Sequence, residues 1–204
     1  TLFPERVRGM VLDSAYEPNG DTVEQQYLTQ LVGFEEAFND WVAWCEDDDT
    51  CAFAAPDVGA RWDALREQLD DQPLTANDGR EINQATMDTA TQAALYSESE
   101  WPVLAAGLAA AEKGVGDQIL AMGDQYNGRH DDGTYDTLFQ SFGIIKCASG
   151  ITTQPPDDPE ALLKKIHEQA PRFGKDVTVE DLTAEEGEDY DGCTELMGTT
   201  APVE

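Results

Sequence analysis

The segment VEQQYLTQLVGFEEAFNDWVAWC, from Val23 to Cys45, carries the strongest structural signal in this 204-residue sequence. Its apolar side chains recur every three or four residues, the spacing that places them on one face of an α-helix. These positions are Val23, Tyr27, Leu31, Phe34, Phe38, Trp41 and Cys45. The pattern predicts a long amphipathic helix, with Thr22 and Gln25 as its N-terminal capping box.

The same type of pattern continues along the chain and predicts a mainly α fold. Asp57 and Asp158 are residues that commonly begin helices, and Pro102 suits a first helical turn. The predicted helices run from Asp57 to Leu69, from about Arg80 to Tyr96, from Ser99 to a stop at Gly114, through Ile119 to Tyr126, and from Asp158 through Ile166. Residues 138–147 are apolar and predict a helix followed by extended chain.

One short segment near the start predicts a strand instead. Met10, Val11 and Leu12 form a continuous apolar run within residues 5–13. A single buried strand leaves its backbone N–H and C=O groups without partners, and no other segment resembles a central strand of a parallel sheet. A strand without a partner suggests that the strands it pairs with belong to a part of the fold that this sequence does not contain.

The charge balance excludes several classes of function. Asp and Glu number 42 against 12 Lys and Arg, a formal net charge of −30. Such a surface repels nucleic-acid phosphates and anionic lipid headgroups, so neither a nucleic acid nor a membrane surface is an expected partner. The longest uncharged run, residues 101–111, is too short to cross a bilayer, which takes about 20 residues.

The four cysteines are expected to be structural. Cys45 and Cys51 are close enough in sequence to staple the turn after the first long helix, and no pair has the C-x-x-C spacing of a zinc or redox site. An even number of cysteines suggests disulfides and an extracytoplasmic location. The sequence begins at Thr1 and contains no signal peptide, so we expect either a mature secreted chain or a piece of a longer protein.

Catalytic motifs are missing from the sequence. The G-x-S-x-G turn of serine hydrolases does not occur, and its nearest approximation, Phe139 to Gly143, lacks the first glycine. His130 and His167 have no metal-ligand spacing and are expected on the surface. The acidic clusters fail the EF-hand pattern, so we expect a solvated acidic surface, with no metal site and no cofactor.

Two carboxylates lie beside the apolar face of the first helix. Glu35 and Glu36 could bind a substrate amine at the edge of the core, although such residues are more often simple surface charges.

Several stretches together resemble the actinobacterial secreted α/β-hydrolases of the tripeptidyl aminopeptidase family. In that family the chain leaves the nucleophile turn, passes through a core strand and enters a large helical cap. The matching stretches are Leu2–Asp13, Gly33–Cys45 with Cys51, Ala94–Tyr96 with Trp101 to Gly114, and Ile144–Cys147. Ser14, Ser149 and Leu196-Met197 depart from the family pattern.

The resemblance implies that this chain is the cap, or lid, of a serine exopeptidase, with one strand of the parent core attached. It divides the chain into a core strand and entry segment (1–20), a helical cap domain (21–175) and an acidic, loop-rich return segment (176–204). The catalytic serine, aspartate and histidine would lie outside, so the chain alone is expected to be inactive. The expected partners are the remainder of the parent core and a short peptide substrate with a free N-terminus.

The family comparison also guides the site predictions. Glu35, Glu36, Ile145 and Ser149 are predicted to line the substrate pocket, and Cys147 is predicted to pair with Cys193 as Cys45 does with Cys51. The expected location is secreted or in the cell envelope. Two alternatives remain: a non-enzymatic acidic secreted domain for adhesion or weak cation binding, and a halophilic intracellular protein, against which the cysteine pairing argues.

Overall fold

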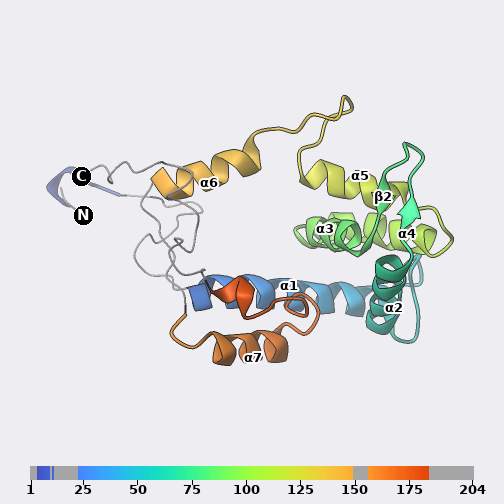
Figure 1. Cartoon of the computed structure of the whole chain (residues 1–204), viewed down its shortest axis with the longest axis horizontal. Coiled ribbons are helices and arrows are strands. Elements are labelled where there is room, and N and C mark those ends of the chain that lie inside the picture. The colour runs from blue at the N-terminus through green and yellow to red at the C-terminus, as the bar shows by residue number, and fades with distance from the viewer. Residues whose placement is uncertain (1–3, 10, 12–22, 149–155, 184–204) are drawn as a thin grey trace.

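The computed structural model describes residues 4–9, 11, 23–148 and 156–183, and its architecture is mainly helical, as predicted (Figure 1). The α-helices are α1 (Val23–Asp47), α2 (Val58–Asp71), α3 (Gln84–Leu95), α4 (Trp101–Ala111), α5 (Asp117–Tyr126), α6 (Leu138–Ala148) and α7 (Pro159–Gln169). Three short 3₁₀ helices are η1 (Pro4–Arg6), η2 (Glu98–Glu100) and η3 (Glu180–Leu182). None of the described helices is both long and apolar enough to cross a membrane.

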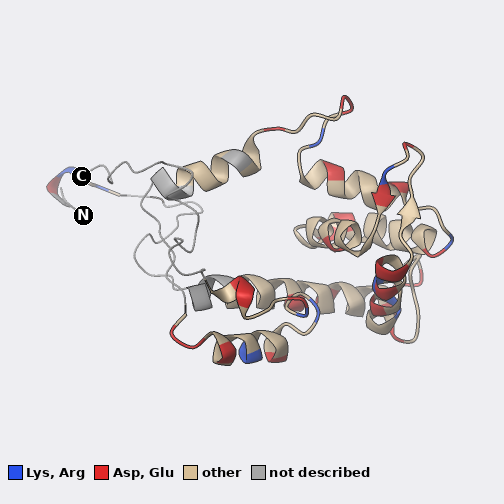
Figure 2. Cartoon of the chain, viewed as in Figure 1, with Lys and Arg blue, Asp and Glu red and all other residues tan. Residues whose placement is uncertain are grey.

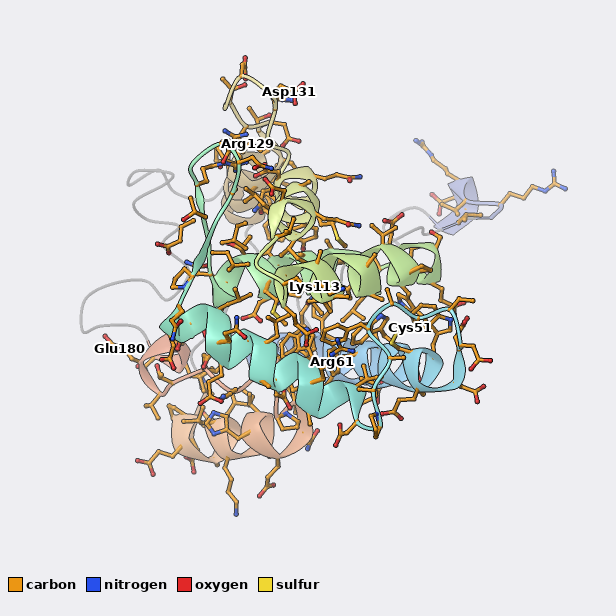
Figure 3. The ribbon with its side chains drawn as sticks, turned by 90° about the vertical axis from the view of Figure 1, so that its right-hand side faces the viewer. Cys51, Arg61, Lys113, Arg129, Asp131 and Glu180 are labelled. Carbon is orange, nitrogen blue, oxygen red and sulfur yellow. A yellow bond between two sulfur atoms is a disulfide. The ribbon has the colours of Figure 1, made fainter. Side chains whose placement is uncertain are left out.

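The long first helix forms as predicted, and its second half enters the core. Phe38, Trp41 and Cys45 are fully buried, because they share the apolar face that the sequence pattern defines. The predicted disulfide between Cys45 and Cys51 is present and holds the following loop against the end of α1 (Figure 3). The predicted cap residue Thr22 lies outside the described residues.

The helix starts are partly as predicted. Asp57 and Asp158 accept the backbone N–H of Ala60 (2.8 Å) and Ala161 (3.0 Å), which confirms them as N-caps of α2 and α7. The prediction that Ser99 caps α4 is wrong. Its hydroxyl bonds to that of Ser97 at 2.8 Å, and α4 continues directly from η2 without a side-chain cap.

A small hairpin replaces the predicted start of the third helix. Strands β1 (Leu74–Thr75) and β2 (Glu81–Ile82) pair antiparallel across a turn in which Gly79 has a φ of +86°. Helix α3 then begins at Gln84, where Asn83 accepts the backbone N–H of Thr86 at 3.1 Å. Residues 80–83 therefore belong to the hairpin and its junction, because a polar Asp-Gly turn favours strand pairing.

The main core lies between α1, α2, α3, α4 and α5, with large buried contributions from Trp62, Met87, Leu104, Leu108 and Ile119. A second, smaller cluster joins α7 to the first half of α1 through buried Leu162, Ile166 and Leu182. Since Leu182 belongs to η3, the described start of the predicted return segment packs on α7 and α1. Helix α1 thus supports both clusters (Figure 1).

The predicted N-terminal strand does not form among residues 4–9 and 11. Pro4–Arg6 is a 3₁₀ turn, and Val11 is 93% exposed, whereas a buried strand was predicted; Met10 and Leu12 lie outside the described residues. The physical reason is that a strand needs a neighbouring strand for its backbone hydrogen bonds, and the only described sheet is the two-residue pairing of β1 with β2.

Candidate functional site

A hollow of about 580 Å³ opens where the ends of α3 and α5 meet the start of α6. Helix α6 and the first half of α1 both extend past these ends in the same direction (Figure 1). The lining is mostly apolar and aromatic: Ala93, Ala94, Tyr96, Ser97, Glu100, Met122, Gln125, Tyr126, Leu138 and Phe139. A hollow with this size and composition is suited to a small organic ligand.

A row of aromatic rings connects four helices along this hollow. The ring centroids of Phe34 and Tyr96 are 5.7 Å apart, those of Tyr96 and Tyr126 are 6.1 Å apart, and those of Tyr126 and Phe139 are 5.8 Å apart. These separations are typical of favourable aromatic pairs. The row therefore supports the wall of the hollow from α1 across α3 and α5 to α6.

The charge in the hollow comes from one side chain. Burial raises the pKa of the Tyr126 hydroxyl, and its hydrogen bond with Tyr96 raises it further, so this phenol stays neutral near pH 7. Glu100 is the one charged residue among the described residues that line the hollow. The site therefore combines aromatic faces with a single negative charge.

Ion pairs hold the loop that leads into α6. Asp124 on α5 accepts two hydrogen bonds from Arg80, each 2.7 Å, and lies 3.7 Å from Arg129. Figure 3 shows Arg129 at the base of the 128–136 loop, next to the tip of the β1–β2 hairpin. Asp136 then accepts the backbone N–H of Leu138 at 2.9 Å, which fixes the turn just before α6.

Helix α6 presents an apolar surface to solvent. It is helical throughout, so the predicted change to extended chain before Cys147 is wrong. Five of its large apolar side chains are exposed: Leu138, Phe139, Phe142, Ile144 and Ile145. No charged residue lies among its described side chains, whereas α1, α2, α3, α5 and α7 all carry acidic residues (Figure 2). An exposed apolar group of this kind marks an interaction surface.

The structure gives Glu35 a bonding role inside the chain. Its side chain is buried, and Oε2 accepts the backbone N–H of Arg172 at 2.9 Å and of Phe173 at 3.3 Å. The Arg172 guanidinium lies 3.4 Å from Oε1 and also binds Asp63. These contacts tie the segment after α7 to α1 and occupy both carboxylate oxygens.

The other predicted pocket residues are not brought together. Glu36 is exposed on α1, Ile145 is exposed on α6, and Ser149 lies outside the described residues. Neither Glu36 nor Ile145 lines the hollow, so their predicted role as pocket walls stays a prediction.

Sequence reasoning did not single out the residues that line the hollow. Tyr96, Glu100 and Phe139 sit at helix ends, where the periodic pattern that identifies a buried face no longer applies. The signal that the sequence offers is the pair of matching family stretches, Ala94–Tyr96 and Trp101 to Gly114, between which Glu100 lies.

A second hollow, of about 360 Å³, is lined by Trp62, Asp63, Arg66, Pro171, Arg172 and Lys175. Its arginines are already paired: Arg66 bonds to Asp88 and Asp176, and Arg172 bonds to Asp63 and Glu35. Because these carboxylates neutralise the guanidinium groups, the cluster is a brace between α2, α3 and the segment after α7.

The predictions for the two histidines can be compared with the structure, whereas the prediction for the second cysteine pair falls on residues that the structure does not describe. His130 and His167 are exposed, as predicted. The Cys147–Cys193 pairing stays a prediction, because Cys193 and the Cys147 side chain lie outside the described residues. Within the described ranges, no three His, Cys, Asp or Glu side chains are grouped so that they could hold a metal ion.

Comparison with known proteins identifies several actinobacterial relatives. The chain is 33% identical to Carboxylesterase B of Mycobacterium tuberculosis over 173 residues, which cover 83% of this chain and 33% of that protein. It is 33% identical to the serine protease Hip1 of the same species over 163 residues (76% and 30%), and 35% identical to the tripeptidyl aminopeptidase of Streptomyces lividans over 106 residues (50% and 19%).

No protein-family model matches the chain. The chain spans about a third of the length of the first two relatives, Carboxylesterase B and Hip1. The names of the relatives describe a carboxylesterase, a serine protease and an aminopeptidase, which share hydrolytic chemistry. Together with the mainly helical fold, these similarities bear out the resemblance noted in the sequence: over most of its length the chain is similar to actinobacterial hydrolases, among them a tripeptidyl aminopeptidase.

Proposed function

We propose that the chain is the cap of a serine hydrolase, which covers the active site and shapes a pocket for short peptides with a free N-terminus. The observation that carries this proposal is the pairing of a ligand-sized hollow with the exposed apolar helix α6 on one side of a helical body. A cap needs both features, because it must contact the catalytic core and also the substrate.

In this proposal the cap positions the substrate and excludes water, and the rest of the parent protein supplies the chemistry. Ester and amide hydrolysis by a serine enzyme needs a serine next to a base and donors for the oxyanion. In this chain the hydroxyls of Ser97 and Ser99 bond to each other, and His167 bonds to the carbonyl of Val177. The catalytic groups are therefore assigned to the parent core, and the chain alone is expected to be inactive.

The extracytoplasmic location is part of the same proposal. A disulfide joins Cys45 and Cys51, and disulfides persist mainly in oxidising compartments. Short peptides with a free N-terminus are expected substrates there, in keeping with the name of the Streptomyces relative.

A fluorophosphonate probe, which labels activated serines, tests the assignment. We expect no labelling of this chain and stoichiometric labelling of a longer protein expressed from the coding sequence extended on both sides. In the longer protein, replacing residues 23–183 by a short linker should reduce cleavage of a tripeptide substrate far more than cleavage of a small acetate ester. Labelling of this chain alone, or equal losses for both substrates, would overturn the proposal.

A further inference from the structure

The hollow between α3, α5 and α6 has a defined chemical character. Nine of its ten lining residues are uncharged near neutral pH, and the tenth is Glu100. Within the described part of the chain, the Glu100 carboxylate has no hydrogen bond or ion pair. By contrast, Glu35 and Asp63 next to the second hollow are already bound by Arg172. The carboxylate of Glu100 is therefore available to a ligand.

The aromatic rings beside Glu100 favour the same kind of ligand. Tyr96 and Tyr126 stack with an interplanar angle of 28°, and Tyr96 is 65% exposed, so its ring is accessible from the hollow. The face of an aromatic ring attracts cations, and a nearby carboxylate adds a charge-assisted hydrogen bond. Leu138, Phe139 and Met122 provide the apolar part of the wall.

We propose that this hollow binds an organic ammonium group carried on an apolar stem, with Glu100 as the acceptor and the Tyr96–Tyr126 pair as the aromatic wall. The net charge of −30 disfavours anionic ligands in the same place. The volume of about 580 Å³ is sufficient for one amino-acid residue with its side chain.

Two parts of a peptide carry this chemistry, and the assignment to a substrate rests on the proposed function. One is the α-ammonium group of an apolar N-terminal residue. The other is the side-chain ammonium of a lysine. Both place a positive charge at the end of an apolar group, so three small probes are needed to separate them.

The test is an NMR titration of the 204-residue chain with phenylalanine amide, N-acetylphenylalanine amide and N-acetyllysine amide. Phenylalanine amide carries an α-ammonium group, its acetylated form carries no charge, and the lysine probe carries only the side-chain ammonium. We expect at least one of the two ammonium probes to shift the Tyr96 and Tyr126 resonances and to bind more tightly than the uncharged probe by about fivefold.

Matched variants locate the interaction. Glu100→Gln should reduce the affinity for the ammonium probe about fivefold and leave the affinity for the uncharged probe unchanged. Glu98→Gln is the control, because it removes a negative charge two residues away, from a side chain that does not line the hollow. It should change the affinity for neither probe. Phe139→Ala should weaken all binding by roughly tenfold. Phe142→Ala removes an exposed ring of the same helix and should have no effect.

The outcomes separate this inference from the proposed function. Equal binding of all three probes, no binding of any, or equal effects of Glu100→Gln and Glu98→Gln would overturn the ammonium site. If the longer protein hydrolyses tripeptides while the probes fail to bind, this inference alone is wrong. If the probes bind as expected but the longer protein does not react with fluorophosphonate, the site stands and its assignment to a hydrolase substrate is wrong.

Discussion

Helices α4 and α6 have the same length and similar composition but opposite environments. Each has 11 residues and is mostly apolar. In α4, Leu104, Leu108 and Ala111 are fully buried among the other helices. In α6, Phe142 is 70% exposed and Ile145 is 63% exposed. The apolar content of a helix therefore predicts that it needs cover, but not whether its own chain supplies that cover.

The difference indicates what each helix needs in order to be stable. A helix that is apolar on all sides is stable only where several surfaces cover it. Helix α4 obtains this cover from α3 and α5, whereas α6 is joined to the body by the 128–136 loop and by the edge of the hollow. In the proposed function, the catalytic core of the parent protein covers the exposed face of α6.

The largest expected effect is on the buried helix. Leu104→Ala leaves a cavity in the core and should lower the free energy of unfolding by about 3 kcal/mol, as such truncations commonly do. Phe142→Ala removes a larger side chain from α6 but should change the stability of this chain by less than about 0.5 kcal/mol, because that side chain is already in water. Urea denaturation followed by circular dichroism measures both. Similar losses for the two variants would mean that α6 is covered within this chain.

The next largest effect concerns the disulfide between Cys45 and Cys51 at the end of α1. Replacing Cys45 and Cys51 together by alanine should destabilise the core by about 2 kcal/mol, because the short loop that they close becomes free in the unfolded chain. The loss should appear in the unfolding of α1 to α5, while hydrogen exchange of α6 amides should be unchanged. An unchanged melting temperature would show that the helix packing alone fixes this loop.

The sequence predicted most of the helical body for a clear reason. Phe38, Trp41 and Leu108 lie on regular three- and four-residue spacings, so burial could be inferred from position alone. The β1–β2 hairpin was missed because each strand is only two residues long, too short to show alternation. The hollow was also missed, because Tyr96 and Phe139 come together through the path of the chain between α3 and α6 rather than through a local pattern.

A smaller effect on stability should distinguish the start of α2, which packs in the core, from the start of the exposed helix α6. Asp57→Ala removes the N-cap of α2 in the core and should cost about 1 kcal/mol of stability. Asp136→Ala removes the hydrogen bond to the backbone N–H of Leu138, which fixes the turn just before α6. This second variant should speed hydrogen exchange in α6 and leave the global unfolding midpoint unchanged. A shift of that midpoint by Asp136→Ala would couple α6 to the core.

The smallest expected effect is a local response to acid in two loops that share one motif. Asp132 accepts the hydroxyl (2.6 Å) and the backbone N–H (2.9 Å) of Thr134, and Asp48 makes the same two bonds to Thr50 at 2.6 and 2.7 Å. These bonds from threonine lower the pKa of both carboxyl groups below the ordinary value of 3.8. A lowered folded pKa means that the loop is stabilised by the ionised form, so the stabilisation is present above pH 3.8 and is lost as pH falls through the folded value.

Both motifs should lose their threonine hydrogen bonds over the same acid range, as seen by NMR of the Thr50 and Thr134 amides. Their surroundings should then respond differently. The loop with Asp48 is tied by the Cys45–Cys51 disulfide to the core, in which Cys45 is fully buried, so its backbone should keep its order. The loop with Asp132 leads to α6, which lacks comparable cover, so acid should increase amide exchange along α6 as well. Asp132→Asn should abolish the pH dependence at Thr134 and leave that at Thr50 intact. Acid-insensitive exchange in α6, with the Thr134 bond lost, would show that the pairing of Arg80 and Arg129 with Asp124 is enough to position that helix.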